Sequence, residues 1–349
     1  MKTRGVFVLK MVPFGQWRHL FTNSKNIRRF IPMKALILST VILVACLVSC
    51  DYPTLPTHLN SSVSCFAVSG ENLFVATQGG VFLSSNSGAS WSPSGLADVQ
   101  WIYSIIANGN DLFAGSEYAG VFHSTNNGAT WTNDTAGMGL TNVSSFTVKD
   151  SCVFAASGDI FRTTNDGVSW TVVDSGLPLR AAHILASNGN SLLAGVDWSG
   201  IFSSSNNGAS WAAVNSGLTG WYFSAISSSN DTLYAGSYNG KVFYSTDNGK
   251  IWFGIYIGLT DSLVTALAVH NGDLFAGTHM GGVFRSTDNG TSWETVNNGL
   301  VDTYGYKPDV TCFSEFNGNL YMGSYGDGVF LSKDDGASWI QINNGLGNW

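Results

Sequence analysis

Short apolar runs alternate with polar turns along most of the chain. Between residues 264 and 297 the apolar runs are Val264–Val269, Leu274–Thr278, Gly282–Ser286 and Ser292–Asn297. The turns between them are Asn271-Gly272-Asp273, His279-Met280-Gly281 and Asp288-Asn289-Gly290. Short runs bounded by Gly, Asn and Asp are typical of β-strands. No window of helical periodicity is long enough to compete, so this segment is predicted to form four antiparallel strands.

The last of these turns recurs with the pattern Ser/Thr-x-Asp/Asn-x-Gly-x-x-Trp. Its tryptophans are Trp91, Trp131, Trp170, Trp211, Trp252, Trp293 and Trp339, and the steps between them are 40, 39, 41, 41, 41 and 46 residues. A period in this range with four strands per repeat is typical of propeller blades. The sequence therefore predicts an all-β, seven-bladed β-propeller. Because Val63 begins a first strand and Ile340–Asn343 ends a fourth, each blade is expected to consist of consecutive residues.

The recurring turn has a structural explanation. Its acidic or amide positions are Asn86, Asn126, Asn165, Asn206, Asp247, Asp288 and Asp334. Their side-chain oxygens can accept backbone N–H groups, the Gly can adopt positive φ, and the Trp is expected to place an apolar ring on the blade. Since a metal ligand would prefer the carboxylate throughout, no metal or cofactor is predicted here.

This turn resembles the Asp-box, or BNR, repeat, and the resemblance covers residues 62–349. Similarity to sialidases would imply an arginine triad, a Tyr nucleophile with a Glu, and an Arg-Ile-Pro motif. That motif is absent, and only Arg162, Arg180 and Arg285 follow residue 50. Xyloglucan-cleaving hydrolases of this group use two facing propellers, whereas this chain has one. An enzyme is therefore not favoured, and a carbohydrate-active hydrolase remains the alternative.

The acidic composition of the chain after residue 50 distinguishes it from two other classes of protein. Residues 1–50 contain eight Lys and Arg and no acid, so the remaining residues carry 8 Lys and Arg against 23 Asp and Glu. A surface this acidic repels phosphate backbones, which argues against nucleic acid as a partner. The propeller that assists photosystem II assembly resembles this chain in fold, but its members display a basic patch. An assembly factor for a membrane protein complex is a further alternative.

The N-terminus resembles that of an exported protein. Lys34 precedes an uncharged apolar run that ends in Leu47-Val48-Ser49-Cys50, which resembles a bacterial lipobox. We expect residues 33–50 to be a lipoprotein signal peptide, Cys50 to be acylated, and residues 51–61 to be a linker. Residues 1–32 are either a basic leader or precede a true start at Met33. The predicted location is the cell envelope, with a lipid anchor in the membrane.

Two cysteines occupy equivalent first-strand positions in neighbouring blades. They are Cys65 in the first blade and Cys312 in the seventh. Equivalent residues point the same way around the ring, so one thiol is expected to face the back of the other cysteine's strand. We interpret both as small packed apolar residues, with a disulfide as the alternative.

Candidate ligand-binding residues gather on the face opposite the recurring turns. This face carries the loops between second and third strands and the loops that join blades. Its aromatic and acidic candidates are Trp101, Tyr118, Trp198, Trp221, Tyr222, Tyr238, Tyr325, Glu117, Asp197 and Asp327. Exposed rings beside carboxylates suit sugar stacking or peptide contacts. The sequence therefore predicts a monomeric binding or scaffold module for a glycan or protein ligand, without catalytic residues.

Overall fold

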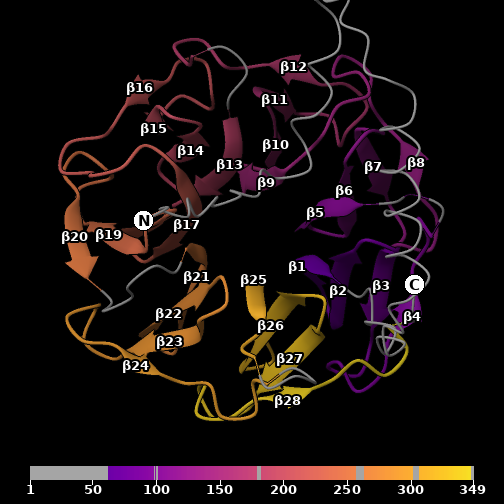
Figure 1. Cartoon of the computed structure of the whole chain (residues 1–349). Coiled ribbons are helices and arrows are strands. Elements are labelled where there is room, and N and C mark those ends of the chain that lie inside the picture. Colours follow the sequence, from indigo (N-terminus) through magenta and orange to yellow (C-terminus); the bar gives the residue numbers. More distant parts are fainter. Residues whose placement is uncertain are drawn as a thin grey trace, which may run out of the picture. The chain divides into compact units, whose positions relative to one another are not determined.

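The computed structural model describes residues 62–97, 99, 101–178, 182–256, 263–301 and 306–346, all within one compact unit, Thr57–Trp349. These residues form seven four-stranded antiparallel sheets arranged as the blades of a ring (Figure 1). The predicted all-β, seven-bladed propeller is confirmed. The predicted signal peptide, linker and Cys50 lie outside the described residues. Within the described ranges, no helix is long and apolar enough to cross a membrane.

The strands follow one another blade by blade. Blade 1 contains β1 (Val63–Ser69), β2 (Asn72–Thr77), β3 (Gly80–Ser84) and β4 (Ser92–Pro93). Blade 2 contains β5 (Ile102–Asn108), β6 (Asp111–Ser116), β7 (Val121–Ser124) and β8 (Thr132–Asn133). Blade 3 contains β9 (Ser145–Lys149), β10 (Cys152–Ser157), β11 (Asp159–Thr163) and β12 (Thr171–Val172). Blade 4 contains β13 (Ala182–Ser187), β14 (Leu192–Val196), β15 (Gly200–Ser204) and β16 (Ala212–Ala213).

The remaining blades repeat the same order. Blade 5 contains β17 (Phe223–Ser229), β18 (Thr232–Ser237), β19 (Lys241–Ser245) and β20 (Phe253–Tyr256). Blade 6 contains β21 (Val264–His270), β22 (Asp273–Thr278), β23 (Gly282–Ser286) and β24 (Glu294–Thr295). Blade 7 contains β25 (Asp309–Phe316), β26 (Asn319–Tyr325), β27 (Gly328–Ser332) and β28 (Ile340–Gln341). The first strand of each blade is innermost and the fourth lies at the rim (Figure 1).

The fourth strands are shorter than predicted. The expected runs Ser292–Asn297 and Ile340–Asn343 pair over only two residues each, Glu294–Thr295 and Ile340–Gln341. One further backbone bond follows, from Val296 N to Val283 O. The chain then turns away because the side chain of Asn297, rather than its backbone, accepts the N–H of Val283, at 2.8 Å.

Each recurring turn is held by the network that the sequence predicts, with one addition. In blade 1 Asn86 Oδ1 accepts the N–H of Ser90, and Ser84 Oγ accepts that of Gly88, at 2.9 and 2.8 Å. Gly88 has positive φ, as predicted, but so does Ser87 before it. The equivalent residues Asn127, Asp166, Asn207, Asn248, Asn289 and Asp335 share this conformation. The enrichment in Asn and Asp follows, because these residues tolerate the left-handed region best.

The interchange of Asp and Asn has a direct chemical cause. In the Asn copies the amide donates to the hydroxyl four residues later, as Asn86 Nδ2 does to Ser90 Oγ at 2.8 Å. In two of the three Asp copies the hydroxyl reverses its role, as Ser292 Oγ donates to Asp288 Oδ2 at 2.6 Å, whereas Asp247 is followed by Ile251 at this position. A hydroxyl is both donor and acceptor, so either residue completes the turn.

The turn tryptophans join neighbouring blades. Trp252 is buried, and its Nε1 donates to Val214 O of the preceding blade at 2.8 Å, while its backbone N donates to Ser216 O. A side chain on Gly217 could not fit, because its Cβ would lie 2.0 Å from Trp252 O. Trp131 and Trp293 are only half-buried. Trp293 differs further, since its Nε1 donates to Gly290 O within its own turn.

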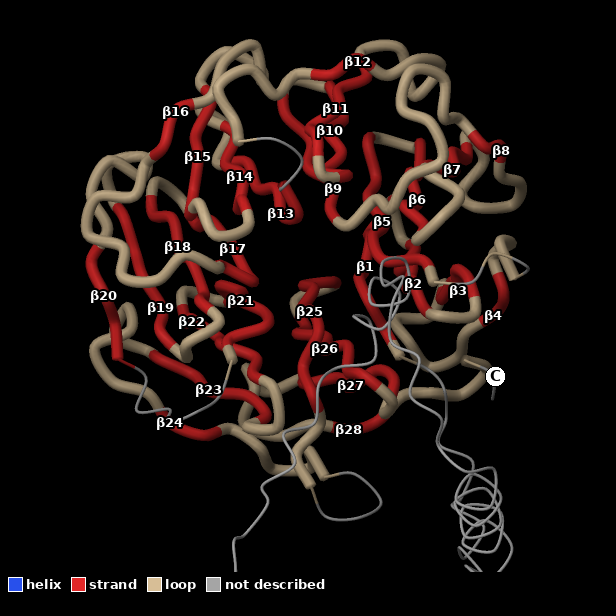
Figure 2. Tube along the Cα trace, turned by 45° about the horizontal axis from the view of Figure 1, so that its top comes forward, coloured by secondary structure: helices blue, strands red, loops and turns tan. Residues whose placement is uncertain are grey.

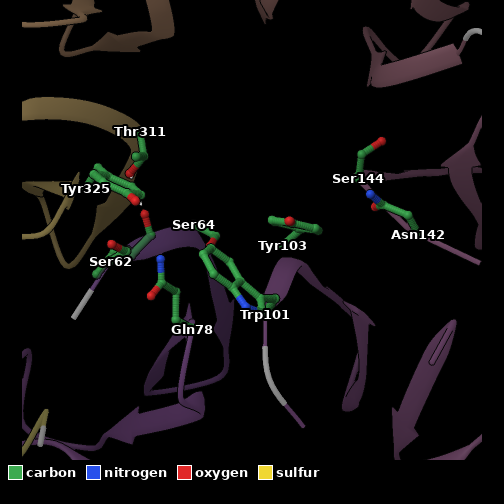
Figure 3. A pocket seen from close by; sticks show the side chains of 10 residues that line it. Ser62, Ser64, Gln78, Trp101, Tyr103, Asn142, Ser144, Thr311 and Tyr325 are labelled. Carbon is green, nitrogen blue, oxygen red and sulfur yellow. Dashed lines mark hydrogen bonds between the residues drawn. The ribbon is translucent and has the colours of Figure 1, made fainter. Parts of the chain in front are cut away.

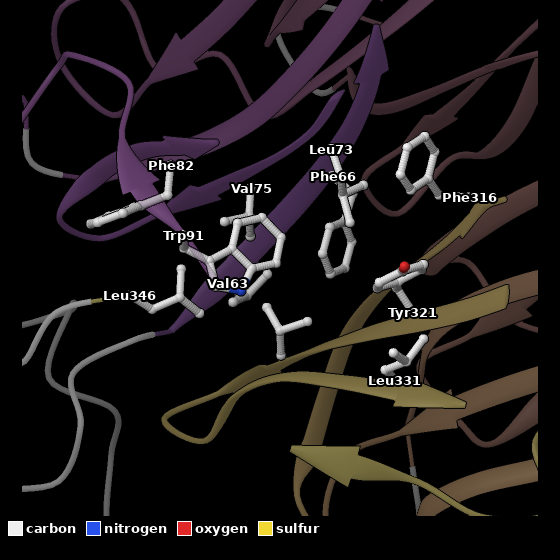
Figure 4. Close-up of a cluster of buried hydrophobic side chains, with 11 residues drawn as sticks. Val63, Phe66, Leu73, Val75, Phe82, Trp91, Phe316, Tyr321, Leu331 and Leu346 are labelled. Atoms are coloured by element: carbon white, nitrogen blue, oxygen red, sulfur yellow. The ribbon is translucent and has the colours of Figure 1, made fainter. Parts of the chain in front are cut away.

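The ring closes by side-chain packing between blades 7 and 1 (Figure 4). Phe66 and Trp91 of blade 1 pack in one cluster with Phe316 and Tyr321 of blade 7. Tyr321 also donates its hydroxyl to Ser87 O at 3.1 Å. Blades 7 and 1 therefore meet through side chains and share no strand. Each blade consists of four consecutive strands, as predicted.

Both candidate disulfide cysteines are free thiols. Cys65 Sγ lies 3.5 Å from Ile105 O of blade 2, and a Cβ built on Gly323 would meet Cys312 Sγ and Val63 of blade 1. Cys65 therefore faces blade 2 while Cys312 packs against the cluster between blades 7 and 1, so the two thiols do not face each other. Burial is the main cause that raises the pKa of both thiols, which suits packed rather than reactive cysteines.

Candidate functional site

The two faces of the ring carry different loops (Figure 2). One face holds the recurring turns and the hairpins between first and second strands. The other, here called the aromatic face, holds the loops between second and third strands and those that join blades. Large side chains there are 57% to 78% exposed: Tyr118, Trp198, Trp221, Tyr238, Met280, Tyr306 and Tyr325. Trp101 and Tyr222 are half-buried, so the predicted aromatic residues do lie at the surface of this face.

Three of these side chains stand on backbone in the left-handed region. Trp101, Trp198 and Met280 have φ of 61°, 57° and 58°. Bulky residues rarely adopt this conformation, which costs on the order of 1–2 kcal/mol per residue. The loops therefore hold these large side chains outward against a local conformational cost.

An aromatic cluster spans blades 4 and 5. Tyr222 lies 6.1 Å from Trp198 and 5.2 Å from Tyr238, measured between ring centroids. His183 stacks on Tyr222 at 4.9 Å. His183 Nδ1 lies 2.7 Å from Asp197 Oδ1, and its Nε2 lies 2.8 Å from Phe223 O. The cluster is thus anchored through an imidazole to the first strands of both blades.

A bulge near the start of the first strand positions the residues at the centre of this face. In six of the seven blades the register with the second strand shifts at this point. The bulged residues Thr265 and Thr311 donate to Val310 O and Val63 O of the next blade, at 2.5 and 2.6 Å. Ser144, at the equivalent position of blade 3, donates in the same way to His183 O at 2.7 Å. In blade 2 the equivalent residue is Tyr103, whose large ring lies toward the centre of the pocket in Figure 3.

Tyr103 lies in an apolar pocket of about 380 Å³ formed by blades 7, 1, 2 and 3 (Figure 3). Its walls include Val63, Trp101, Tyr325 and Thr311, with Ser62, Ser64, Gln78, Asn142 and Ser144 supplying polar atoms. Burial, followed by the charge of Glu117 and a hydrogen bond to it, raises the pKa of Tyr103 to about 12. Tyr103 is therefore a neutral donor at physiological pH.

A second pocket, of about 480 Å³, adjoins the first through the shared residues Asn142 and Ser144. It lies between blades 2, 3 and 4 and is lined by Glu117, Tyr118, Leu140, Thr141, Ser157, Gly158, Ala182, His183 and Asp197 as well. The side-chain oxygens of Thr141 and Ser157 are buried without a hydrogen-bond partner. The two pockets lie side by side at these shared residues and are together called the groove, with an apolar half and an acidic half.

The structure brings together most, but not all, of the predicted site. Trp101 and Tyr325 line the apolar pocket, Glu117, Tyr118 and Asp197 line the acidic pocket, and Trp198, Tyr222 and Tyr238 form the cluster beside it. Trp221 and Asp327 are not among the residues that line either pocket. Sequence reasoning missed Tyr103, Asn142, Ser144 and His183. The available signal was Tyr103, a bulky residue where five other blades carry Ser or Thr.

The described residues contain no group of three or more His, Cys, Asp or Glu that could hold a metal ion. Arg162 and Arg285 lie on β11 and β23, the third strands of their blades, as predicted. Arg285 is paired with Asp273. The groove accordingly offers carboxylates, hydroxyls, two amides, an imidazole and aromatic rings.

Comparisons with known proteins agree with this architecture. Residues 53–140 match the model of the DUF6242 beta propeller domain. No curated protein matches the chain.

Among solved structures, the chain is similar to the extracellular domain of the two-component system BT4673 from B. thetaiotaomicron, with a TM-score of 0.66 and 15% identity. The match covers 78% of this chain but only 38% of that one. The chain is also similar to the GH74 xyloglucanase from Xanthomonas campestris, with a TM-score of 0.66 and 15% identity, over 83% of this chain and 55% of that one. YCF48 from Cyanidioschyzon merolae matches with TM-score 0.63 and 14% identity, over 79% of this chain and 96% of that one. At these identities the likeness is one of fold, and the chain is a seven-bladed β-propeller.

Proposed function

We propose that this propeller is an exported binding module whose ligand, a glycan or a protein segment, lies along the groove of the aromatic face. The observation that carries the proposal is the pair of adjoining pockets flanked by exposed rings. Exposed Trp and Tyr side chains are costly to leave in water, and such patches commonly mark interaction sites. Three bulky side chains held at positive φ support the same conclusion, because such strain is concentrated at functional sites.

The structural neighbours support a binding role outside the cytoplasm. The similar domain of BT4673 is extracellular, and a structure of YCF48 shows it bound to D1 peptide. We propose that the chain is attached to the cell envelope through acylated Cys50. Mass spectrometry of the membrane fraction should find a lipidated Cys50, and Cys50→Ala should leave the precursor unprocessed. Normal processing of that variant would rule out this anchor.

The binding proposal is tested by probing glycan and peptide arrays with the full chain. A triple variant, Tyr118→Ala with Trp198→Ala and Tyr325→Ala, should weaken binding of any array ligand by more than tenfold. Each lost stacking contact contributes about 0.5–1.5 kcal/mol beyond its buried area, and 1.4 kcal/mol is a factor of ten.

A matched control removes exposed apolar side chains away from the aromatic face. Val168 and Ile251 belong to recurring turns, Phe253 lies on the outer strand β20, and all three are exposed. The variant Val168→Ala with Ile251→Ala and Phe253→Ala should bind like the wild type. The proposal fails if the control loses binding and the aromatic triple variant keeps it, or if no array ligand binds. Cleavage of an arrayed glycan would instead identify a hydrolase.

A further inference from the structure

The two halves of the groove differ in chemistry, and this difference constrains the ligand. The apolar half presents mainly carbon atoms from Val63, Trp101, Tyr103 and Tyr325. The acidic half begins at the shared residues Asn142 and Ser144 and contains both groove carboxylates. A ligand that fills the whole groove must therefore place an apolar group beside a polar group of suitable charge.

The charge of the acidic half excludes anionic groups. Among the residues that the structure describes, those lining it include Glu117 and Asp197 and no Lys or Arg. Tyr103 hydrogen-bonds to Glu117 without neutralising it, and His183 Nδ1 faces Asp197. Even with a protonated His183, the two carboxylates and one imidazolium of the described lining residues leave one net negative charge. Because complementary charge favours and like charge opposes association, a cation is the favoured occupant.

The remaining groups in this half suit a planar cation. Thr141 Oγ1 and Ser157 Oγ are buried hydroxyl oxygens that lack a partner, and each can accept a hydrogen bond. Tyr118 lines this half and presents an exposed ring from the second-to-third-strand loop of blade 2, and Trp198 presents another from the equivalent loop of blade 4. A guanidinium group has several donors in a fixed plane, pairs with carboxylates and stacks on aromatic rings.

We propose, building on the proposed function, that the groove binds a protein segment in which an apolar side chain fills the pocket at Trp101 and Tyr103 and a nearby arginine enters the pocket at Glu117 and Asp197. The apolar half provides the desolvated surface, and the acidic half provides the charge selectivity. A neutral or anionic glycan would leave the two carboxylates without a cationic partner.

The test uses the full chain and synthetic peptides in which Leu or Phe is separated from Arg by one to four residues. Each peptide has a twin in which citrulline, a neutral isostere, replaces Arg. We expect at least one Arg peptide to bind more than tenfold more tightly than its twin, with affinity falling as salt rises. Glu117→Gln with Asp197→Asn should remove this preference, so that the Arg peptide and its citrulline twin bind with similar affinity.

A charge-matched control separates local from general electrostatics. Glu71 and Asp231 are exposed residues in the hairpins of the opposite face. Glu71→Gln with Asp231→Asn removes the same two charges and should keep the preference for Arg. Equal binding of the twins, or an equal loss in the control, overturns the inference. If array glycans bind in a manner sensitive to the aromatic triple variant but no Arg peptide does, this inference fails while the proposed function stands.

Discussion

The two faces of the ring use the same strands for opposite purposes. On the face of the recurring turns, side chains satisfy one another, and hairpins bond to the next blade, as Asn188 Nδ2 does to Asn248 Oδ1 at 2.8 Å and Asn271 Nδ2 to Asp335 Oδ1 at 2.8 Å. On the aromatic face, large rings project into water and buried hydroxyls lack partners. The first face is nearly identical from blade to blade, whereas the second differs in every blade.

This difference separates stability from recognition. A turn that recurs seven times stabilises the ring, because the copies share the same local bonds and six of the seven tryptophans bond to the preceding blade. A surface that varies between blades can contact each part of a bound ligand with a different side chain. Substitutions on one face should therefore alter folding, and those on the other should alter binding.

The largest expected effect concerns Trp252. Its side chain is 2% exposed, whereas that of Trp198 is 78% exposed. Trp252→Ala should lower the free energy of unfolding by roughly 3–5 kcal/mol, because it leaves a large cavity and removes the bond to Val214 O. Trp198→Ala should change it by less than about 0.5 kcal/mol. Chemical denaturation measures both, and similar losses in the two variants would erase the distinction between the faces.

A pair of glycines tests the close approach between blades. Gly217 and Gly272 both have φ of +90°, so Ala is strained at either position. A Cβ at Gly217 would lie 2.0 Å from Trp252 O, while nothing lies within 4 Å of one at Gly272. Gly217→Ala should therefore be less stable than Gly272→Ala by about 1–3 kcal/mol, the usual range for overpacking. Equal unfolding energies would show that strain alone determines the cost.

Replacing Trp198 by Gly should weaken ligand binding without lowering the stability of the fold. The φ of 57° at Trp198 is unfavourable for Trp and accessible to Gly. Trp198→Gly should leave the free energy of unfolding unchanged or raise it by up to about 1 kcal/mol, by removing part of the left-handed cost. The same variant should weaken binding of the array ligand. A clear loss of stability would mean that the exposed ring stabilises the blade.

The smallest expected effect is a loss of fold stability at acidic pH. Hydrogen bonds from the side chain and backbone of Ser292, then from Ser286, lower the pKa of Asp288 to about 2. Similar bonds lower the pKa values of Asp247 and Asp334. The ionised carboxylates therefore contribute stability above their usual pKa, and this is lost as pH falls from about 4 toward 2.

The matched variant replaces Asp247, Asp288 and Asp334 by Asn. Its stability at pH 7 should stay close to that of the wild type, because four copies already function with Asn at this position. Its loss of stability between pH 4 and pH 2 should be smaller, as measured by thermal unfolding across that range. If the variant and the wild type lose the same stability between pH 4 and pH 2, these carboxylates do not contribute to the pH dependence of folding.

The sequence predicts the fold far better than the groove. The spacing of the tryptophans and the Asp, Asn and Gly positions of the turns determine blade number, strand order and the role of each turn. The second left-handed residue, at Ser87 and its equivalents, was not predicted, although the preference for Asn and Asp was visible. The groove was harder, because it forms where Tyr103 replaces a small hydroxyl residue on a bulged strand. Its neighbours Asn142, Ser144 and His183 come from other blades, and only the folded ring shows which of them share a pocket.

The central claim is that ligands contact the aromatic face alone. Hydroxyl-radical footprinting of the full chain, with and without a ligand selected from the arrays, measures this directly at individual side chains. We expect reduced oxidation at Tyr118, Trp198 and Tyr325, which are all more than half exposed in the free protein. Val168 and Ile251, which are exposed in the recurring turns, should be oxidised equally in both states. Protection of Val168 and Ile251 with unchanged oxidation of the three aromatic residues would contradict the account.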